Sequence, residues 1–284
     1  FCGNPAPRHD SCKRLAMNDP NGGWLKSKNN SYLWRSVHPL PDTNMKIRLF
    51  TLPNLLTLSN LLCGTIATAV VFTRGDLRLA FWLLVLAAAF DFFDGFTARL
   101  LRQSSPIGLQ LDSLADMVSS GVAPAAVMLT LARQADTAWW AADTQALWSW
   151  GALLLTVGAA LRLAKFNVDD SQRTEFCGLP SPAAGLFCAS LGLLRAEGLL
   201  ALPCEAVLLA AVVTAWLMIS PIRMFALKFH GFGWADNRLR YLFLGTCVVL
   251  IFCLRAYAIP AIIVLYVAVS LVRWLVQGRR ATEA

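Results

Sequence analysis

Charged residues are scarce in this chain. Only 15% of its 284 residues are Asp, Glu, Lys or Arg, whereas 57% are hydrophobic, and the mean hydropathy is +0.55. In soluble globular domains about a quarter of all residues are charged and about half are apolar. This composition excludes an ordinary soluble domain and favours a protein that lies in a membrane.

Zinc-ligand patterns are also missing. The chain has three His and eight Cys, and the cysteines form no C-x-x-C pair and have no His neighbour at zinc spacing. Half of them fall inside the long apolar runs, where Cys behaves as a small apolar residue. The pattern therefore argues against a disulfide framework and against a zinc site.

Long apolar runs are abundant. Each is near the length of about 20 residues that a helix needs to cross a bilayer. We therefore predict an all-α fold, a polytopic membrane helical bundle with about eight transmembrane helices. The predicted spans are 55–72, 79–100, 109–131, 147–168, 182–202, 206–222, 241–254 and 259–276.

The positive charges are distributed unevenly between the two sides of such a bundle. Eight spans leave 20 of the 25 Lys and Arg on one side and five on the other. Because positive charge accumulates on the cytoplasmic side, we expect both termini there. The net charge of +8 then faces anionic membrane lipids, and no nucleic-acid partner is expected. We expect an integral protein of a bacterial inner membrane.

The first residues differ from the rest. Residues 1–44 are polar and lack hydrophobic periodicity, so we expect a disordered leader, or translated upstream sequence, before one membrane domain over 45–284. Within 47–60, polar Asn54, Thr57 and Asn60 recur at helical spacing. Three interpretations fit this polar row: an amphipathic helix at the membrane interface, the polar-faced start of the first span, or hydrogen bonding between helices.

Four aspartates stand close together in this apolar sequence, in the pattern D-x2-DG-x2-AR-x8-G-x3-D-x3-D over 91–116. Helical geometry places Asp91 and Asp94 on one face at the end of the second span. Asp112 and Asp116, four residues apart, share a face at the start of the third. A short turn joins these spans, so we expect antiparallel neighbours with the two acidic faces opposed.

Converging carboxylates repel one another strongly at low dielectric, and divalent cations reverse that repulsion. Ligand sets made only of oxygen suit Mg²⁺ or Mn²⁺, and two ions fit four carboxylates. We therefore predict a metal site near the cytoplasmic boundary. Pairing of helix-end charges with basic residues is one alternative, and an ion path through an ion-coupled transporter is another. The transporter explains the acids but not the small residues Gly95 and Ala98 or the cation Arg99.

The motif resembles the signature of the CDP-alcohol phosphotransferase family, membrane enzymes of phospholipid synthesis. In that family a nucleotide-activated lipid or alcohol donates its phosphate-linked group to an acceptor hydroxyl and releases CMP. The resemblance implies that Asp91, Asp94 and Asp112 bind metal, with Asp116 as metal-proximal general base, and it implies a homodimer. It also implies a set of small or polar residues that bind the CDP-linked substrate: Asn54, Thr57, Gly95, Ala98, Arg99 and Gly108.

Residues 161–185 resemble the segment R-x-A-[RK]-F-N…F-x-G-L-P-x-P-x-A of the branch that uses serine. This implies transfer of the phosphatidyl group of CDP-diacylglycerol to the hydroxyl of L-serine. The implied serine-side residues are Arg162, Lys165, Asn167, Gly178 and Pro180. Lys165 stands where Arg is common and lacks its planar fork.

Blander roles remain open for this segment. Arg162 and Lys165 also fit charges that set topology at the membrane surface, and the Gly-Leu-Pro turn also fits a structural role. Another acceptor, glycerol 3-phosphate or inositol, would use the same chemistry, although a phosphorylated acceptor calls for a denser basic cluster.

Overall fold

The computed structural model describes residues 50–282 except 104, 138–141, 169–175 and 225–233. The predicted leader 1–44 lies outside the described residues. The described part belongs to one contact unit, Leu49–Ala284.

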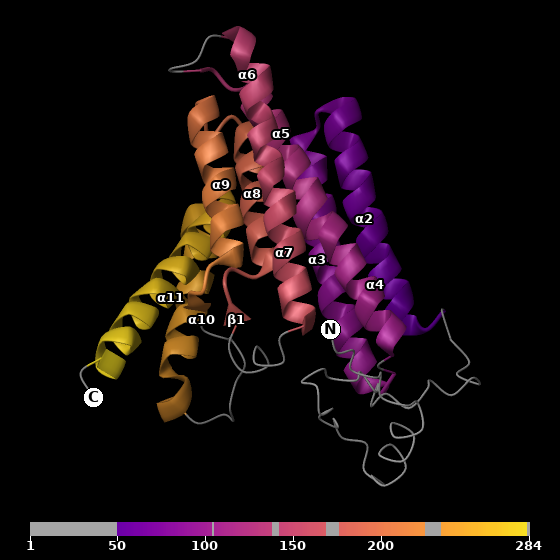
Figure 1. Cartoon of the computed structure of the whole chain (residues 1–284), viewed down its shortest axis with the longest axis vertical. Coiled ribbons are helices and arrows are strands. Elements are labelled where there is room, and N and C mark those ends of the chain that lie inside the picture. Colours follow the sequence, from indigo (N-terminus) through magenta and orange to yellow (C-terminus); the bar gives the residue numbers. More distant parts are fainter. Residues whose placement is uncertain (1–49, 104, 138–141, 169–175, 225–233, 283–284) are drawn as a thin grey trace, which may run out of the picture. The chain divides into compact units, whose positions relative to one another are not determined.

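The described residues form a bundle of helices, and the predicted helical class is confirmed (Figure 1). In chain order the elements are α2 (Leu52–Arg74), α3 (Leu77–Leu100), α4 (Pro106–Asp116), η1 (Met117–Val122), α5 (Ala123–Gln134), α6 (Ala142–Ser149), η2 (Trp150–Leu153), α7 (Leu154–Val168), β1 (Phe176–Cys177), α8 (Ser181–Ala196), α9 (Cys204–Ile219), β2 (Arg223–Met224), α10 (Trp234–Leu254), η4 (Arg255–Tyr257) and α11 (Ala258–Thr282).

Within the part of the chain that the structure describes, five helical stretches are long and apolar enough to cross a membrane: Leu52–Arg74, Leu77–Leu100, Pro106–Gln134, Thr144–Val168 and Tyr241–Val276. Helices α8 and α9 are apolar but have only 16 residues each. The last stretch is interrupted by η4, where Arg255 has a φ of 48°. The predicted membrane character is therefore confirmed, whereas the count of eight spans is not.

Helix ends follow from local chemistry. Thr51 caps α2 by accepting a hydrogen bond from the amide of Asn54, and Gly75, with a φ of 65°, ends it. The fifth predicted span, 182–202, is too long because α8 ends at Ala196. Gly198, with a φ of 68°, turns the chain there.

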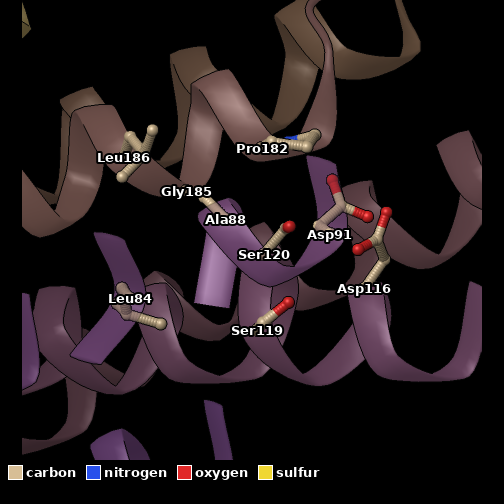
Figure 2. A pocket seen from close by; sticks show the side chains of 9 residues that line it. All are labelled: Leu84, Ala88, Asp91, Asp116, Ser119, Ser120, Pro182, Gly185 and Leu186. Carbon is tan, nitrogen blue, oxygen red and sulfur yellow. The ribbon is translucent and has the colours of Figure 1, made fainter. Parts of the chain in front are cut away.

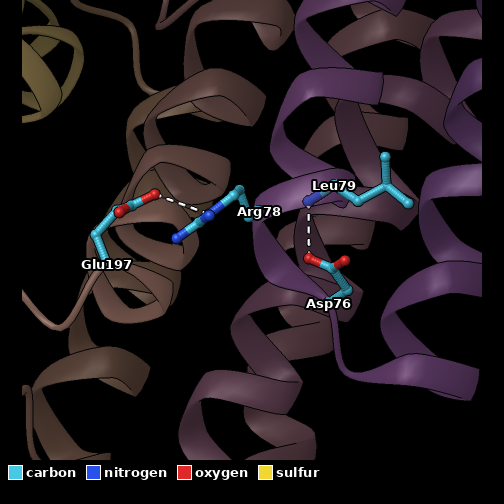
Figure 3. Close-up of polar contacts among 4 residues, drawn as sticks. All are labelled: Asp76, Arg78, Leu79 and Glu197. Carbon is cyan, nitrogen blue, oxygen red and sulfur yellow. Dashed lines mark hydrogen bonds and ion pairs between the residues drawn. The ribbon is translucent and has the colours of Figure 1, made fainter.

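Figure 3 shows how the start of α3 is held. Asp76 accepts a hydrogen bond from the amide of Leu79 at 2.9 Å, which caps the helix. Arg78 pairs with Glu197 at 2.8 Å, so the start of α3 meets the end of α8. Both partners of this pair are exposed, so it contributes little to stability.

The third predicted span contains a break in helical register. Between α4 and α5 lies η1, a π-helical turn in which the amide of Ala123 bonds to the carbonyl of Val118, five residues earlier. Pro124 has no N–H to donate to the carbonyl of Ser120, which disfavours the ordinary helical pattern here. The hydrophobic periodicity predicted one uninterrupted helix over 109–131, whereas the structure has a π-helical turn within it.

Helix α2 packs along α3 and also against α4, while α3 and α4 make few direct contacts with each other. Close backbone packing of α3 against α4 is therefore not observed, although the predicted opposition of their acidic faces is confirmed for Asp91, Asp112 and Asp116. These acidic faces meet beside α2, which packs against both helices. Small residues such as Ala67, Ala80 and Ala159 are fully buried and let the helices approach closely.

Candidate active site

Three of the four predicted aspartates converge. Carboxylate oxygens of Asp91 on α3 and of Asp112 and Asp116 on α4 lie within 4.8 Å of one another. Asp116 is only 9% exposed. Figure 2 shows Asp91 and Asp116 directed toward each other from two helices.

This geometry is compatible with divalent metal binding. Magnesium–oxygen distances are about 2.0–2.1 Å, so oxygens bound to one ion lie up to about 4 Å apart, and two-metal sites separate the ions by about 3.5–4 Å. Three carboxylates within 4.8 Å fit either a shared ion or two adjacent ions. The donor set contains only oxygen, which suits hard cations.

Asp94 is buried one turn after Asp91 and lies outside that trio. Its carboxylate accepts a hydrogen bond from the hydroxyl of Thr57 on α2 at 2.5 Å. Asn60, one turn further along α2, donates to the carboxylate of Asp116 at 3.2 Å. Hydrogen bonding between helices, one interpretation of the polar row, is thus confirmed for Thr57 and Asn60.

Asn60 was not predicted as a site residue. It is fully buried, and its other amide atom, Oδ1, has no hydrogen-bond partner among the described residues. The signal was present, since Asn60 continues the polar row. Its partner depends on how α2 packs, which the sequence does not encode locally.

A cavity of about 180 Å³, here called the larger cavity, opens beside Asp94 and Asp112. Most residues predicted to bind the CDP-linked substrate line it: Asn54, Thr57, Gly95, Ala98 and Gly108. Arg99 does not line it; its Nε donates to the carbonyl of Gly95 at 3.0 Å. A side chain at position 95 would meet nothing within 4 Å, so Gly95 leaves open space above the backbone.

A second space, the smaller cavity, adjoins Asp91 and Asp116 (Figure 2). Two of the aspartates, Asp91 and Asp116, line it. The other lining residues belong to α3, η1 and α8: Leu84, Ala88, Ser119, Ser120, Pro182, Gly185 and Leu186. The four aspartates therefore divide into two pairs, one facing each cavity.

Two predicted serine-side residues lie next to the aspartate face. Arg162 donates from Nη1 to the hydroxyl of Ser181 at 2.7 Å and lies within electrostatic range of Asp116. Asn167 donates to the hydroxyl of Ser113, the neighbour of Asp112, at 2.9 Å. Helix α7 thus directs two polar side chains toward α4 and α8.

The other three serine-side residues are placed differently. Lys165 is exposed on α7. The amide of Gly178 bonds to the carbonyl of Ile222 at 2.9 Å, and a side chain there would overlap with the carbonyl of Met218. Pro180 precedes α8. Among the described residues, neither Gly178 nor Pro180 lines the two cavities. The Gly-Leu-Pro turn precedes α8, and the amide of Leu179 donates to the carbonyl of Leu217 near the end of α9.

A family model confirms what the aspartate geometry suggests. The model for CDP-alcohol phosphatidyltransferase matches residues 50–227, which is more than half of the chain and includes all four aspartates. The chain belongs to the CDP-alcohol phosphatidyltransferase family. The metal-compatible cluster lies within the part of the chain that matches this family.

Similar proteins share one name, CDP-diacylglycerol–serine O-phosphatidyltransferase. That of Bacillus subtilis (strain 168) is 30% identical over 179 residues, covering 63% of this chain and 92% of the relative. That of Mycobacterium leprae (strain TN) is 34% identical over 165 residues, covering 55% of this chain and 51% of the relative. That of Saccharomyces cerevisiae is 39% identical over 112 residues, covering 36% and 37% respectively.

Proposed function

We propose that this chain transfers the phosphatidyl group of CDP-diacylglycerol to the hydroxyl of L-serine, giving phosphatidylserine and CMP. The observation that supports this best is the carboxylate cluster between two cavities in a chain of this family. The shared name of the relatives supports serine as the acceptor.

The larger cavity is the site that we assign to the CDP part of the lipid. Small residues there leave the backbone accessible, which suits a nucleotide and a pyrophosphate. Asn54 and Thr57 offer polar groups on one wall, and Asp94 with Asp112 forms another. Arg99 lies on the same helix as Gly95 and supplies a positive charge near phosphate.

The aspartates would hold Mg²⁺ or Mn²⁺, two ions in our proposal, through Asp91, Asp94, Asp112 and Asp116. Bound cations of this kind neutralise the pyrophosphate and stabilise CMP as the leaving group. Thr57 fixes the orientation of Asp94, and Asn60 fixes that of Asp116. Such hydrogen bonds from neighbouring residues position metal ligands in general.

Asp116 is the residue that we assign as general base. It accepts the proton of the serine hydroxyl, whose oxygen forms a bond to the phosphorus of the phosphatidyl group. The bond between that phosphorus and the CMP oxygen breaks, and CMP departs with the electron pair. We assign Arg162, which lies within electrostatic range of Asp116, to the serine carboxylate; Asn167 lies five residues further along α7.

The membrane arrangement is part of the proposal. We propose one membrane domain over 45–284 with about eight spans in a bacterial inner membrane, in which α8 and α9 also cross. The acyl chains of the donor then lie in the bilayer, and the aspartates face the cytoplasm. A homodimer and the pocket roles of Lys165, Gly178 and Pro180 remain proposals that rest on the family resemblance.

A single assay tests which acceptor the chain uses. Membranes containing the chain are incubated with CDP-diacylglycerol, Mn²⁺ or Mg²⁺, and labelled serine, glycerol 3-phosphate or inositol in turn. CMP release and lipid labelling with serine alone is the expected result. Labelling with either other acceptor instead would assign the chain to a different reaction of the same family, and no labelling with any acceptor would refute the transferase.

A further inference from the structure

Two buried hydroxyls in the π-helical turn have no role in the function described so far. Ser119 and Ser120 are 8% and 6% exposed and belong to η1, directly after Asp116. Both line the smaller cavity with Asp91 and Asp116. Figure 2 shows the hydroxyl of Ser120 directed toward Asp91.

These hydroxyls differ from most other helical hydroxyls among the described residues. Serine and threonine in a membrane helix usually bond to the carbonyl four residues earlier, which removes the cost of an unpaired polar group. Several residues here do so: Ser59, Thr65, Thr68, Thr73, Ser113 and Thr246. Within the described part of the chain, Ser119 and Ser120 make no such bond, and their hydroxyls are available to a ligand in the cavity.

The packing around η1 holds the two serines in place. A side chain at Gly64 of α2 would lie 2.8 Å from the Cα of Ser119. A side chain at Gly185 of α8 would lie 3.1 Å from the Cα of Ser120. Helices therefore contact the turn through backbone on two sides. A π-helical turn inside an α-helix is frequently found at a functional site.

We propose that Ser119 and Ser120 bind the ammonium end of the acceptor amino acid in the smaller cavity, beside Asp116. This inference rests on the proposed serine acceptor. Hydroxyl oxygens accept hydrogen bonds from an ammonium group, which has only donors. Both hydroxyls line the same cavity as Asp116, so an ammonium group bound there lies next to the proposed general base.

The opposite end of the acceptor has a separate partner. Arg162 donates a hydrogen bond to the hydroxyl of Ser181. The next residue, Pro182, lines the smaller cavity. A carboxylate near Arg162 and an ammonium near Ser120 orient the amino acid between them. The hydroxymethyl group then lies toward Asp116, where its proton is removed.

The test uses the full-length protein in detergent with CDP-diacylglycerol and Mg²⁺, and compares wild type with the double variant Ser119→Ala/Ser120→Ala. Loss of a hydrogen bond to a ligand weakens binding by about 3- to 10-fold. We expect the KM for L-serine and its dissociation constant, from serine-induced thermal stabilisation, to rise about 10-fold or more in the double variant. The KM for CDP-diacylglycerol stays within about twofold.

Two controls isolate the ammonium contact. Ser190→Ala removes another buried hydroxyl, one that bonds to the carbonyl of Phe187 on α8, and should leave both KM values unchanged. The acceptor 3-hydroxypropionate has the hydroxyl and carboxylate of serine but no ammonium. The wild-type protein should therefore transfer the phosphatidyl group to 3-hydroxypropionate slowly. The double variant should have the same rate with this acceptor as the wild-type protein.

The outcomes separate this inference from the proposed function. If wild-type protein binds serine but releases no CMP, the proposed transferase activity is contradicted. The comparison of serine binding between wild type and the double variant then still tests the role of the two hydroxyls. Serine binding that is absent in wild type, or equal in wild type and the double variant, overturns the inference. A parallel rise in both KM values also overturns it, because that result indicates a general distortion of the site.

Discussion

At the scale of single residues, the proposed reaction depends on how Asp116 is held. Its carboxylate accepts from Asn60 of α2 and lies near Arg162 of α7, so three helices set its environment. A base that removes a proton from a bound hydroxyl must point at that hydroxyl, and small misplacements are costly. Asn60 is therefore a positioning residue.

Replacing Asn60 by Ala should lower kcat about 10- to 100-fold, the usual effect of losing a hydrogen-bond partner of a metal-site residue. The requirement for Mg²⁺ or Mn²⁺ should rise, and the KM for CDP-diacylglycerol should change little. Steady-state assays over a metal titration measure both effects. Thr68→Val, which removes a hydroxyl bonded only within α2, is the control. Normal kcat and metal requirement in Asn60→Ala would show that Asp116 is oriented by something else.

Sequence patterns identified the aspartates but not all their partners. The spacing of Asp112 and Asp116 predicts a shared helix face because four residues make about one turn. The bond between Asn60 and Asp116 joins residues 56 positions apart, and only the packing of α2 against α4 creates it. Ser119 and Ser120 gave no signal, since periodicity assumes an uninterrupted α-helix.

At the scale of elements, the third span is the part that differs most from expectation. Gly121 and Pro124 suggest a local weakness, but whether a helix kinks, breaks or forms a π-helical turn depends on its neighbours. Here α2 contacts η1 at Gly64 with no room for a side chain. That contact keeps the turn, and with it Asp116, next to Asn60.

Gly64→Ala should therefore destabilise the bundle, by about 1–3 kcal/mol, because a methyl group would lie 2.8 Å from backbone of η1. Thermal unfolding in detergent should show a lower midpoint and reduced turnover. Gly245→Ala on α10 is the matched control, because a side chain there meets nothing within 4 Å. Equal midpoints for the two variants would mean that α2 and η1 are not in close contact.

At the scale of the whole molecule, apolar runs and charge asymmetry predicted the class of fold. The membrane-length stretches follow from composition alone. The packing of α2, α3 and α4 does not follow from composition. Helices that are adjacent in sequence are expected to pack together, but here α2 packs against both α3 and α4. The segment 225–233, next to α10, lies outside the described residues.

The predicted orientation places Gln103, in the turn after α3, on the cytoplasmic side and Gly198, after α8, on the opposite side. Single cysteines at these positions, in a variant whose native cysteines are replaced, should react differently with a membrane-impermeant maleimide. In intact cells only Gly198→Cys should be labelled, whereas Gln103→Cys should react after the cells are opened. Labelling of Gln103→Cys in intact cells would place the aspartates on the outer side.

The central claim is that the four aspartates catalyse phosphatidyl transfer to serine. The most direct measurement supplies purified protein with CDP-diacylglycerol, ¹⁵N-serine and Mg²⁺ or Mn²⁺, and quantifies labelled phosphatidylserine and CMP together. The account predicts equal amounts of the two products, dependence on the metal, and a fall of at least about 100-fold in Asp116→Asn with CDP-diacylglycerol still bound. CMP release without serine, or an undiminished rate in Asp116→Asn, would contradict it.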